Sequence, residues 1–421
     1  MVFCRICGTR LEDNARFCDR CGTSIGQMPV RIEHASSLNS LPDHKVDKTS
    51  TQSKTSTIFA KLLPWAFMTF AVCLLGQYTL ENDVQTFFLD DKYYEMILTA
   101  LRVRPFEYYS IAVALYHQLY APTLAIIHFP LIFYIWLIVP TDSNVKWLYF
   151  AFALAGTVAA YWTVAVITKR RSLAILTGAW IAYFLQTGAY FMFEYWAITV
   201  FLVGLSYFVS ERHVPAAVAI GLATLIKEVF APFMVIASIY YALPIIQRFC
   251  LKQLKIGEFF NKEKASARPQ TIRQAIVWCL ATSIVGLAYY QNGIASQGTT
   301  SPVQFFRTFD LSLLPMLFSN SWFTYPPIPV TLTVCLGLIG ISTLARWDQR
   351  IIVYSSFASM ILLMLTAGDQ GLISTWEEIQ QSAPRYVAMS ITLINLFWLI
   401  GIYKIIIYIG RKINISLDFL P

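Results

Sequence analysis

Two adjacent carboxylates, Asp90 and Asp91, directly follow the first long apolar segment of the chain. Charged residues make up only 13% of the sequence, and few of them interrupt the hydrophobic stretches. Two carboxylates side by side repel each other and attract a nearby cation. This position predicts acid chemistry at a membrane surface, where a lipid-carried substrate would present its head group.

A structural role accounts for the same two residues. From Tyr93 the apolar side chains recur at helical spacing through Ile97 to Leu101, which predicts a short amphipathic helix lying on the membrane. Asp90 would then cap the helix, and Asp91 would complement the partial positive charge of its N-terminus. The sequence leaves the chemical and the structural interpretation open.

The first polar block contains two Cys-x-x-Cys-Gly motifs, CRICG and FCDRCG. Together they offer four thiolates to one tetrahedral Zn²⁺, from Cys4, Cys7, Cys18 and Cys21. Disulfides or a redox-active Cys-x-x-Cys are the alternatives, but a segment this small has no core and needs a metal to fold. The motifs resemble the zinc-ribbon family over residues 3–25. Reduced cysteines imply a cytosolic N-terminus.

The composition predicts an all-α polytopic membrane protein, because 57% of its 421 residues are hydrophobic. We expect three parts: a zinc ribbon at 1–25, a flexible Ser- and Thr-rich linker at 26–57, and a transmembrane domain of eight to twelve helices at 58–421. The net charge of +8 lies mainly in short connections. Such connections are topology signals and do not form a nucleic-acid surface.

The basic connections predict the orientation of the chain. If the first span, near 58–80, starts in the cytosol, every strongly basic connection returns to the cytosolic side, and both termini are cytoplasmic. The protein is then a multi-pass protein of the cell membrane. The basic connections are residues 168–172, 210–213, 247–274, 345–350 and Arg411–Lys412.

Two apolar stretches, 110–139 and 214–246, are too long for one straight span and short for two. Each is expected to form a tight helical hairpin or a re-entrant element. In the second stretch Lys227 and Glu228 mark the expected turn. As neighbours on a helix their side chains would point apart, which argues against a mutual ion pair.

Three short motifs resemble the membrane glycosyltransferases of the GT-C superfamily. The first is the acidic pair followed by the Arg104-Pro105-Phe106-x-Tyr108 stretch, and the second is ERHVPAAVAIGLATLIKEVFAPFM, a basic turn before a Gly-rich span that ends in a Lys. The third, HFPLIFYIWLIVP with a later Trp-led span and KRR, is similar to the polyprenyl-phosphate mannose branch. The resemblance covers roughly residues 58–409.

This resemblance implies transfer of a sugar from a polyprenyl phosphate to an acceptor hydroxyl at the outer membrane face. One of Asp90 and Asp91 would be the general base, and the other would orient the hydroxyl or hold a divalent cation. The leaving phosphate needs cations beside it. The candidates are Lys92, Arg102, Arg104, Lys227 and Arg385. Taken alone, each of them is explained more simply as an interfacial side chain that extends toward lipid head groups.

The competing class is a non-enzymatic membrane protein, either a lipid-linked sugar flippase or a scaffold whose ribbon recruits a cytosolic protein. Transporters tend to carry ionisable residues at mid-membrane and to show paired internal repeats. The sequence shows no convincing repeat, and its ionisable candidates, Glu194 among them, lie at the ends of apolar runs. The expected partners are therefore membrane lipid, a polyprenyl-phosphate sugar and a cytosolic protein, without nucleic acid.

Residues 247–274 are predicted to be cytosolic, because short basic connections resist translocation. A cysteine introduced there should not react with a membrane-impermeant thiol reagent applied to intact cells, but should react after permeabilisation. The unmodified protein provides the background from native cysteines. Efficient labelling of intact cells would invert the topology and place Asp90 and Asp91 on the wrong side for the expected chemistry.

Overall fold

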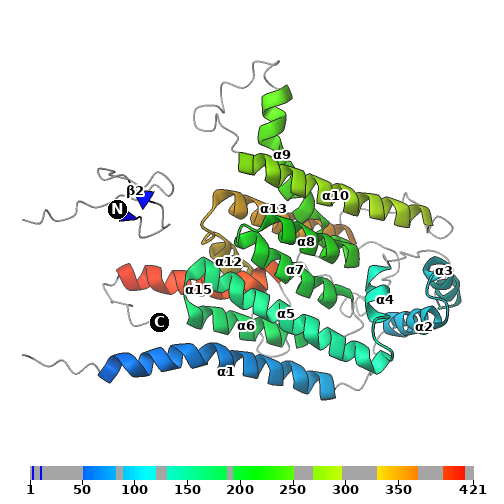
Figure 1. Ribbon diagram of the computed structural model, residues 1–421, viewed down its shortest axis with the longest axis horizontal. Helices are drawn as coiled ribbons and strands as arrows, with labels where there is room; N and C mark the ends of the chain where they lie inside the picture. Colours follow the sequence, from blue (N-terminus) through cyan, green and yellow to red (C-terminus); the bar gives the residue numbers. More distant parts are fainter. Residues whose placement is uncertain are drawn as a thin grey trace, which may run out of the picture. The chain divides into compact units, whose positions relative to one another are not determined.

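The structure is a computed structural model, shown in Figure 1. It describes residues 2–3, 10–11, 51–81, 89–119, 130–186, 193–250, 269–295, 330–367 and 392–412. The chain divides into two compact units, Met1–Ser56 and Thr57–Pro421. In the described part of the first unit, β1 (Val2–Phe3) pairs with β2 (Arg10–Leu11) in an antiparallel hairpin.

The described part of the second unit is built from helices. The first of them, α1, begins at Thr51, in the last residues of the first unit and inside the segment expected to be a linker. The helices are α1 (Thr51–Glu81), α2 (Leu89–Val103), α3 (Tyr108–Leu119), α4 (Leu131–Trp136), α5 (Asp142–Thr168), α6 (Arg171–Gln186), α7 (Phe193–Val209), α8 (His213–Ile226), the 3-10 helix η1 (Glu228–Phe230), α9 (Ala231–Cys250), α10 (Pro269–Ala295), α12 (Val330–Ile341), α13 (Trp347–Ala367) and α15 (Thr392–Lys412). The expected all-α character is thus confirmed for these residues.

The core lies around α7, which is buried along most of its length. Helix α5 runs parallel to α7, because Tyr149 contacts Trp196 near their N-termini and Gly156 lies against Thr199 farther along. Helix α8 returns antiparallel, and Gly204 of α7 leaves room for Ile220 of α8. Small residues at these contacts let the helix backbones approach closely, as is common between membrane helices.

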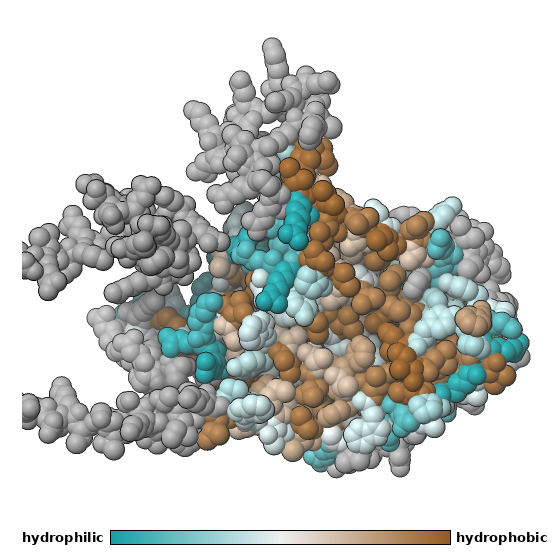
Figure 2. Space-filling view, in the orientation of Figure 1, coloured by the Kyte–Doolittle hydropathy of each residue, from teal (hydrophilic) through white to brown (hydrophobic). Residues whose placement is uncertain are grey.

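The outer surface of the helical unit is strongly apolar. On α10 the exposed large hydrophobic residues recur every fourth position, at Ile272, Ile276, Leu280 and Ile284. Figure 2 shows apolar residues gathered over the face where α9 and α10 lie. A stripe of this kind faces lipid or another apolar partner, because water would not favour so large an exposed patch.

Four helical segments among the described residues are long and apolar enough to cross a membrane. They are Asn144–Thr168, Glu228–Ile246, Ile272–Asn292 and Thr392–Gly410. Shorter apolar helices, of 10–17 residues, are Leu62–Gln77, Arg171–Leu185, Phe193–Val209, His213–Ile226 and Leu332–Ile341. These findings are consistent with a membrane protein, whereas the expected number of eight to twelve spans stays a prediction.

Several basic connections meet at one end of the helical unit, which we call the basic end. Arg346, between α12 and α13, forms an ion pair of 3.0 Å with Glu211 in the α7–α8 turn. The amide of Gln349 donates to the carbonyl oxygens of Phe208 and Val209, 3.3 Å away in each case. Because α5 and α7 are parallel, the basic α5–α6 turn at 168–172 lies at the same end. The sequence-based topology placed all of these connections on one side of the membrane.

The two ambiguous stretches fold differently from each other. Residues 214–246 form α8 and α9, and the chain breaks its helix at Lys227, where the turn was expected. In the stretch 110–139 the described helices are short, since α3 has 12 residues and α4 has 6. At about 1.5 Å per residue neither can cross a hydrocarbon layer of about 30 Å by itself.

The contact between α12 and α15 depends on glycine. A methyl group added at Gly340 would overlap the backbone carbonyl of Phe397, so Gly340→Ala must push the two helices apart. We expect this variant to lose about 1–3 kcal/mol of unfolding free energy, measured by thermal unfolding in detergent. Gly286→Ala on α10 is the control, because nothing lies within 4 Å of a methyl group there. Equal stability of the two variants would contradict the close approach.

Candidate functional site

Helix α2 carries the acidic pair, and its apolar face is buried in protein. Tyr93, Ile97 and Leu101 are buried, and the Tyr93 hydroxyl donates to the carbonyl of Ala112 on α3 at 2.9 Å. The predicted amphipathic helix is therefore present, but the prediction that its apolar face lies on the membrane is wrong. The sequence pattern shows only that one face avoids water, and here α3, α4 and α7 cover that face.

Asp90, Asp91 and Lys92 occupy the first turn of α2, because the helix begins at Leu89. One turn later, the ring of Tyr94 stacks on Phe193 at the start of α7, with 4.3 Å between the ring centroids. This contact brings the acidic turn of α2 next to the N-terminus of α7. We call this part of the helical unit the α2 end.

Two of the predicted phosphate-binding arginines already have protein partners. Arg102 donates from Nη1 to the carbonyl of Val139 at 2.9 Å and also to that of Pro140, so it ties α2 to the α4–α5 connection. Arg104 is exposed and pairs with Glu107 at 3.1 Å. A phosphate role for either residue stays a prediction. Arg385 lies outside the described residues.

Among the described residues, the α2 end contains a buried ion pair. Lys227 Nζ lies 3.3 Å from Glu194 Oε1, and the two side chains are only 3% and 8% exposed. Glu194 belongs to the first turn of α7, where the helix dipole favours a negative charge. Charges are costly to bury unless they are paired, so each residue stabilises the other in this apolar unit.

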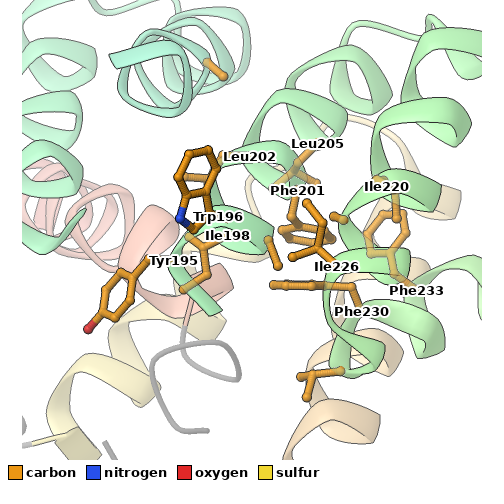
Figure 3. Close-up of a cluster of buried hydrophobic side chains, with 14 of the residues drawn as sticks. Tyr195, Trp196, Ile198, Phe201, Leu202, Leu205, Ile220, Ile226, Phe230 and Phe233 are labelled. Atoms are coloured by element: carbon orange, nitrogen blue, oxygen red, sulfur yellow. The ribbon is translucent and has the colours of Figure 1, made fainter. Parts of the chain in front are cut away.

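The backbone at Lys227 explains how the lysine reaches Glu194. Lys227 ends α8 in an extended conformation, with φ −149° and ψ 123°, and its N–H still donates to the carbonyl of Ala223. Ile226 and Phe230 on the two sides of this break are buried. Figure 3 shows both residues gathered with Phe201 of α7, whose ring stacks on Phe230 at 4.4 Å. This packing holds the backbone in place on both sides of the break at Lys227.

A third charged group, Glu228, lies beside the pair. Its Oε1 atom is 4.0 Å from Lys227 Nζ, and the side chain is 42% exposed. The expectation that Lys227 and Glu228 avoid each other was wrong, because it assumed a continuous helix and the chain is extended at Lys227. The three groups carry a net charge of −1, from two carboxylates and one ammonium.

Sequence reasoning missed a second polar network, located at the basic end. His213 contacts Gln274 at 2.8 Å and accepts at Nδ1 from the indole of Trp278 at 3.3 Å. Nearby, the Tyr241 hydroxyl donates to Asp348 at 3.0 Å. These residues are far apart in the sequence, so only the fold brings them together. The network joins α8, α9, α10 and α13 and has a structural role as a clamp.

Arg346 is the charged centre of this clamp. It donates two hydrogen bonds to Asp348 and pairs with Glu211. Burial lowers the pKa of its guanidinium, but the hydrogen bond and charge of Asp348, with the charge of Glu211, raise it more. The net pKa therefore lies above the ordinary arginine value, and the group stays protonated. Glu211 itself has a φ of 62°, a left-handed conformation that ends the turn after α7.

Comparison with known proteins identifies the N-terminal segment. Residues 3–25 match the family model of a zinc-ribbon domain. A search of curated proteins finds no match to the chain. The zinc-ribbon interpretation of the Cys-x-x-Cys motifs is thus supported, whereas the resemblance of the helical unit to glycosyltransferases stays a prediction.

The described part of the first unit fits a zinc ribbon. The β1–β2 hairpin pairs Phe3 with Arg10, so the first motif, with Cys4 and Cys7, lies in the connection between its two strands. All four motif cysteines lie outside the described residues. Among the described residues, no cluster of three or more His, Cys, Asp or Glu could hold a metal ion. Thiolates of the four cysteines would hold Zn²⁺ as a structural ion.

We expect the purified protein to contain one zinc ion per chain. Cys18→Ser should lower the bound zinc, because the motifs supply four thiolates and no polar substitute. Elemental analysis of the full-length protein measures the content. Cys279→Ser is the control, since Cys279 is a free cysteine on α10. Unchanged zinc in Cys18→Ser, or a metal-free wild type that folds equally well, would contradict the assignment.

Proposed function

We propose that the protein is a multi-pass membrane glycosyltransferase of the GT-C type. It would move a sugar from a polyprenyl-phosphate donor to an acceptor hydroxyl at the membrane face opposite the basic end. The zinc ribbon would recruit a cytosolic protein partner. In this proposal the helical unit performs the chemistry at the α2 end.

The observation that carries the proposal is the placement of ionisable residues at the α2 end. The acidic turn of α2 lies next to α7 through the contact of Tyr94 with Phe193, and Glu194 follows Phe193 directly. Lys227 then joins this region through its ion pair with Glu194. These two contacts link three segments of the chain that carry ionisable residues, α2, α7 and the α8–η1 break, and this link supports the proposal.

Each of these residues would have a separate role in the reaction. Asp90 or Asp91 would accept the proton of the acceptor hydroxyl, and the other would orient that hydroxyl or hold a divalent cation. Lys227 would stabilise the negative charge of the departing polyprenyl phosphate, with Lys92 and Arg385 as further candidates. The apolar surface of the helices would keep the polyprenyl chain in the lipid layer.

A non-enzymatic membrane protein is the alternative, either a flippase for a lipid-linked sugar or a scaffold. The break between α8 and η1 resembles, in general form, the interrupted helices that transporters use at their binding sites. Lys227 at the break pairs, however, with Glu194, whose neighbour Phe193 stacks on Tyr94 of α2, and this link to the acidic helix supports the enzyme proposal. Activity of the acid variants distinguishes these classes.

The acidic pair is tested with Asp90→Asn and Asp91→Asn in a sugar-transfer assay with a defined polyprenyl-phosphate donor. Loss of the base should lower turnover by about a hundredfold or more, because Asn cannot accept the proton. A merely structural acid in the first turn of α2 would cost about 1 kcal/mol of stability or less and leave turnover nearly intact.

The two variants should be matched for folding by thermal unfolding before they are compared. Glu211→Gln is the control, because it also removes a carboxylate, but one at the basic end, which is the opposite end of α7 from the α2 end. Full activity of both Asp→Asn variants would leave the proposed enzyme without its base. No transfer by the wild type with any polyprenyl-phosphate donor would favour the non-enzymatic alternative.

A further inference from the structure

The turn between α2 and α3 exposes large apolar side chains. We call residues 103–107 the α2–α3 tip. Val103 is 79% exposed and Phe106 is 95% exposed, the highest value for a large apolar side chain among the described residues. The turn is closed within itself, because the N–H of Glu107 donates to the carbonyl of Arg104 at 3.2 Å. The apolar side chains therefore project from a well-formed turn.

On the α2 side, a hydrogen-bonded arginine holds the tip in place. Arg102 donates from Nη1 to the carbonyl of Val139, at 2.9 Å, and to that of Pro140. Both carbonyls belong to the α4–α5 connection, a few residues before the candidate span Asn144–Thr168. This side of the tip is thus attached at the beginning of one candidate span.

On the α3 side, a tyrosine ties the tip to a second candidate span. The Tyr109 hydroxyl donates to Oδ1 of Asn292 at 2.7 Å, and Asn292 is the last residue of the candidate span Ile272–Asn292. The ends of membrane-spanning helices lie where the hydrocarbon layer meets the head groups. Two attachments on opposite sides of the tip therefore place it at this boundary.

The neighbouring exposed residues have the composition of a membrane boundary. Trp147 near the start of α5 is 46% exposed, Tyr290 near the end of α10 is 67% exposed, and Tyr134 on α4 is 40% exposed. Trp and Tyr concentrate at the boundary between lipid and water, because their rings are apolar and carry a polar group. Ile138, next to the carbonyl that Arg102 binds, is 74% exposed and adds a further apolar side chain.

A second protein fits this surface less well than lipid does. Val103, Phe106 and Ile138 together expose less than the roughly 800 Å² that each partner of a stable protein complex buries. The Arg104–Glu107 pair, at 3.1 Å, is about half-exposed and lies within the tip. Long charged side chains beside apolar ones suit a head-group region, where the charges keep contact with water.

We infer that the α2–α3 tip inserts Val103 and Phe106 into bilayer lipid at the boundary between hydrocarbon and head groups, and so anchors α2 to the membrane. The contact is with acyl chains and needs no particular head group. It replaces the expected contact through the apolar face of α2, which protein covers. The inference goes beyond the proposed function, because it does not depend on sugar transfer.

The experiment places a fluorescent amino acid, excited outside the tryptophan band, at position 106 of the full-length protein in phosphatidylcholine vesicles. Lipids brominated on the acyl chain quench a probe in lipid, and iodide on both sides of the vesicle membrane quenches a probe in water. Bromine near the head-group end of the chain should quench most strongly, because interfacial elements insert by about 5–10 Å. Iodide should quench weakly, and a probe at position 103 should behave in the same way.

Two other probe positions provide matched references. Leu280 is 59% exposed near the middle of the candidate span Ile272–Asn292, so bromine near the end of the acyl chain should quench a probe there most strongly. Arg212 is exposed in the α7–α8 turn, and a probe there should be quenched by iodide. Thermal unfolding shows whether each labelled protein keeps the stability of the wild type.

Three results would overturn the inference. Quenching at position 106 by iodide as strong as at position 212, without quenching by brominated lipid, would place the tip in water. Protection from both quenchers would show that protein covers the tip. Quenching with the depth profile of position 280 would place the tip inside the hydrocarbon layer. None of these results bears on the sugar-transfer assay, so the inference and the proposed function can fail separately.

Discussion

The constraint on which this structure depends is the cost of placing charge inside an apolar helical unit. Glu194 and Lys227 meet that cost by pairing at 3.3 Å where α8 breaks and α7 begins. Because the lysine must turn inward, the chain becomes extended at Lys227, and Ile226 and Phe230 insert into the core on either side. One electrostatic requirement thus sets a break in the backbone and the packing around it.

The same constraint operates differently at the basic end. There Arg346 bridges Glu211 and Asp348 across the α7–α8 and α12–α13 connections, and the buried His213 shares its ring nitrogens with neighbouring polar groups. These contacts connect different helices and turns of the same chain, so the network holds the turns together. At the α2 end, by contrast, Glu228 leaves one charged group half-exposed beside a buried ammonium. A structural clamp and a candidate binding site therefore occupy opposite ends of the same helices.

Many helices of the larger unit could be predicted from hydropathy, because lipid-facing helices need long apolar runs. The break in the 214–246 stretch occurs at the expected Lys227. Periodicity also predicted α2, yet it assigned the buried face to the membrane. Hydrophobic spacing shows that a helix face avoids water, but it does not distinguish lipid from protein as the surface that covers that face.

The sequence by itself determined the zinc ribbon, the helical character of the larger unit and the segments in which candidate acids and cations occur. Local patterns suffice for these features, since ligand spacing and apolar periodicity act over a few residues. Only the tertiary structure decided that Lys227 pairs with Glu194, 33 positions earlier in the chain, and that Tyr94 brings α2 beside that pair. Pairings of this kind depend on how helices pack and where a backbone breaks, and no local pattern records either.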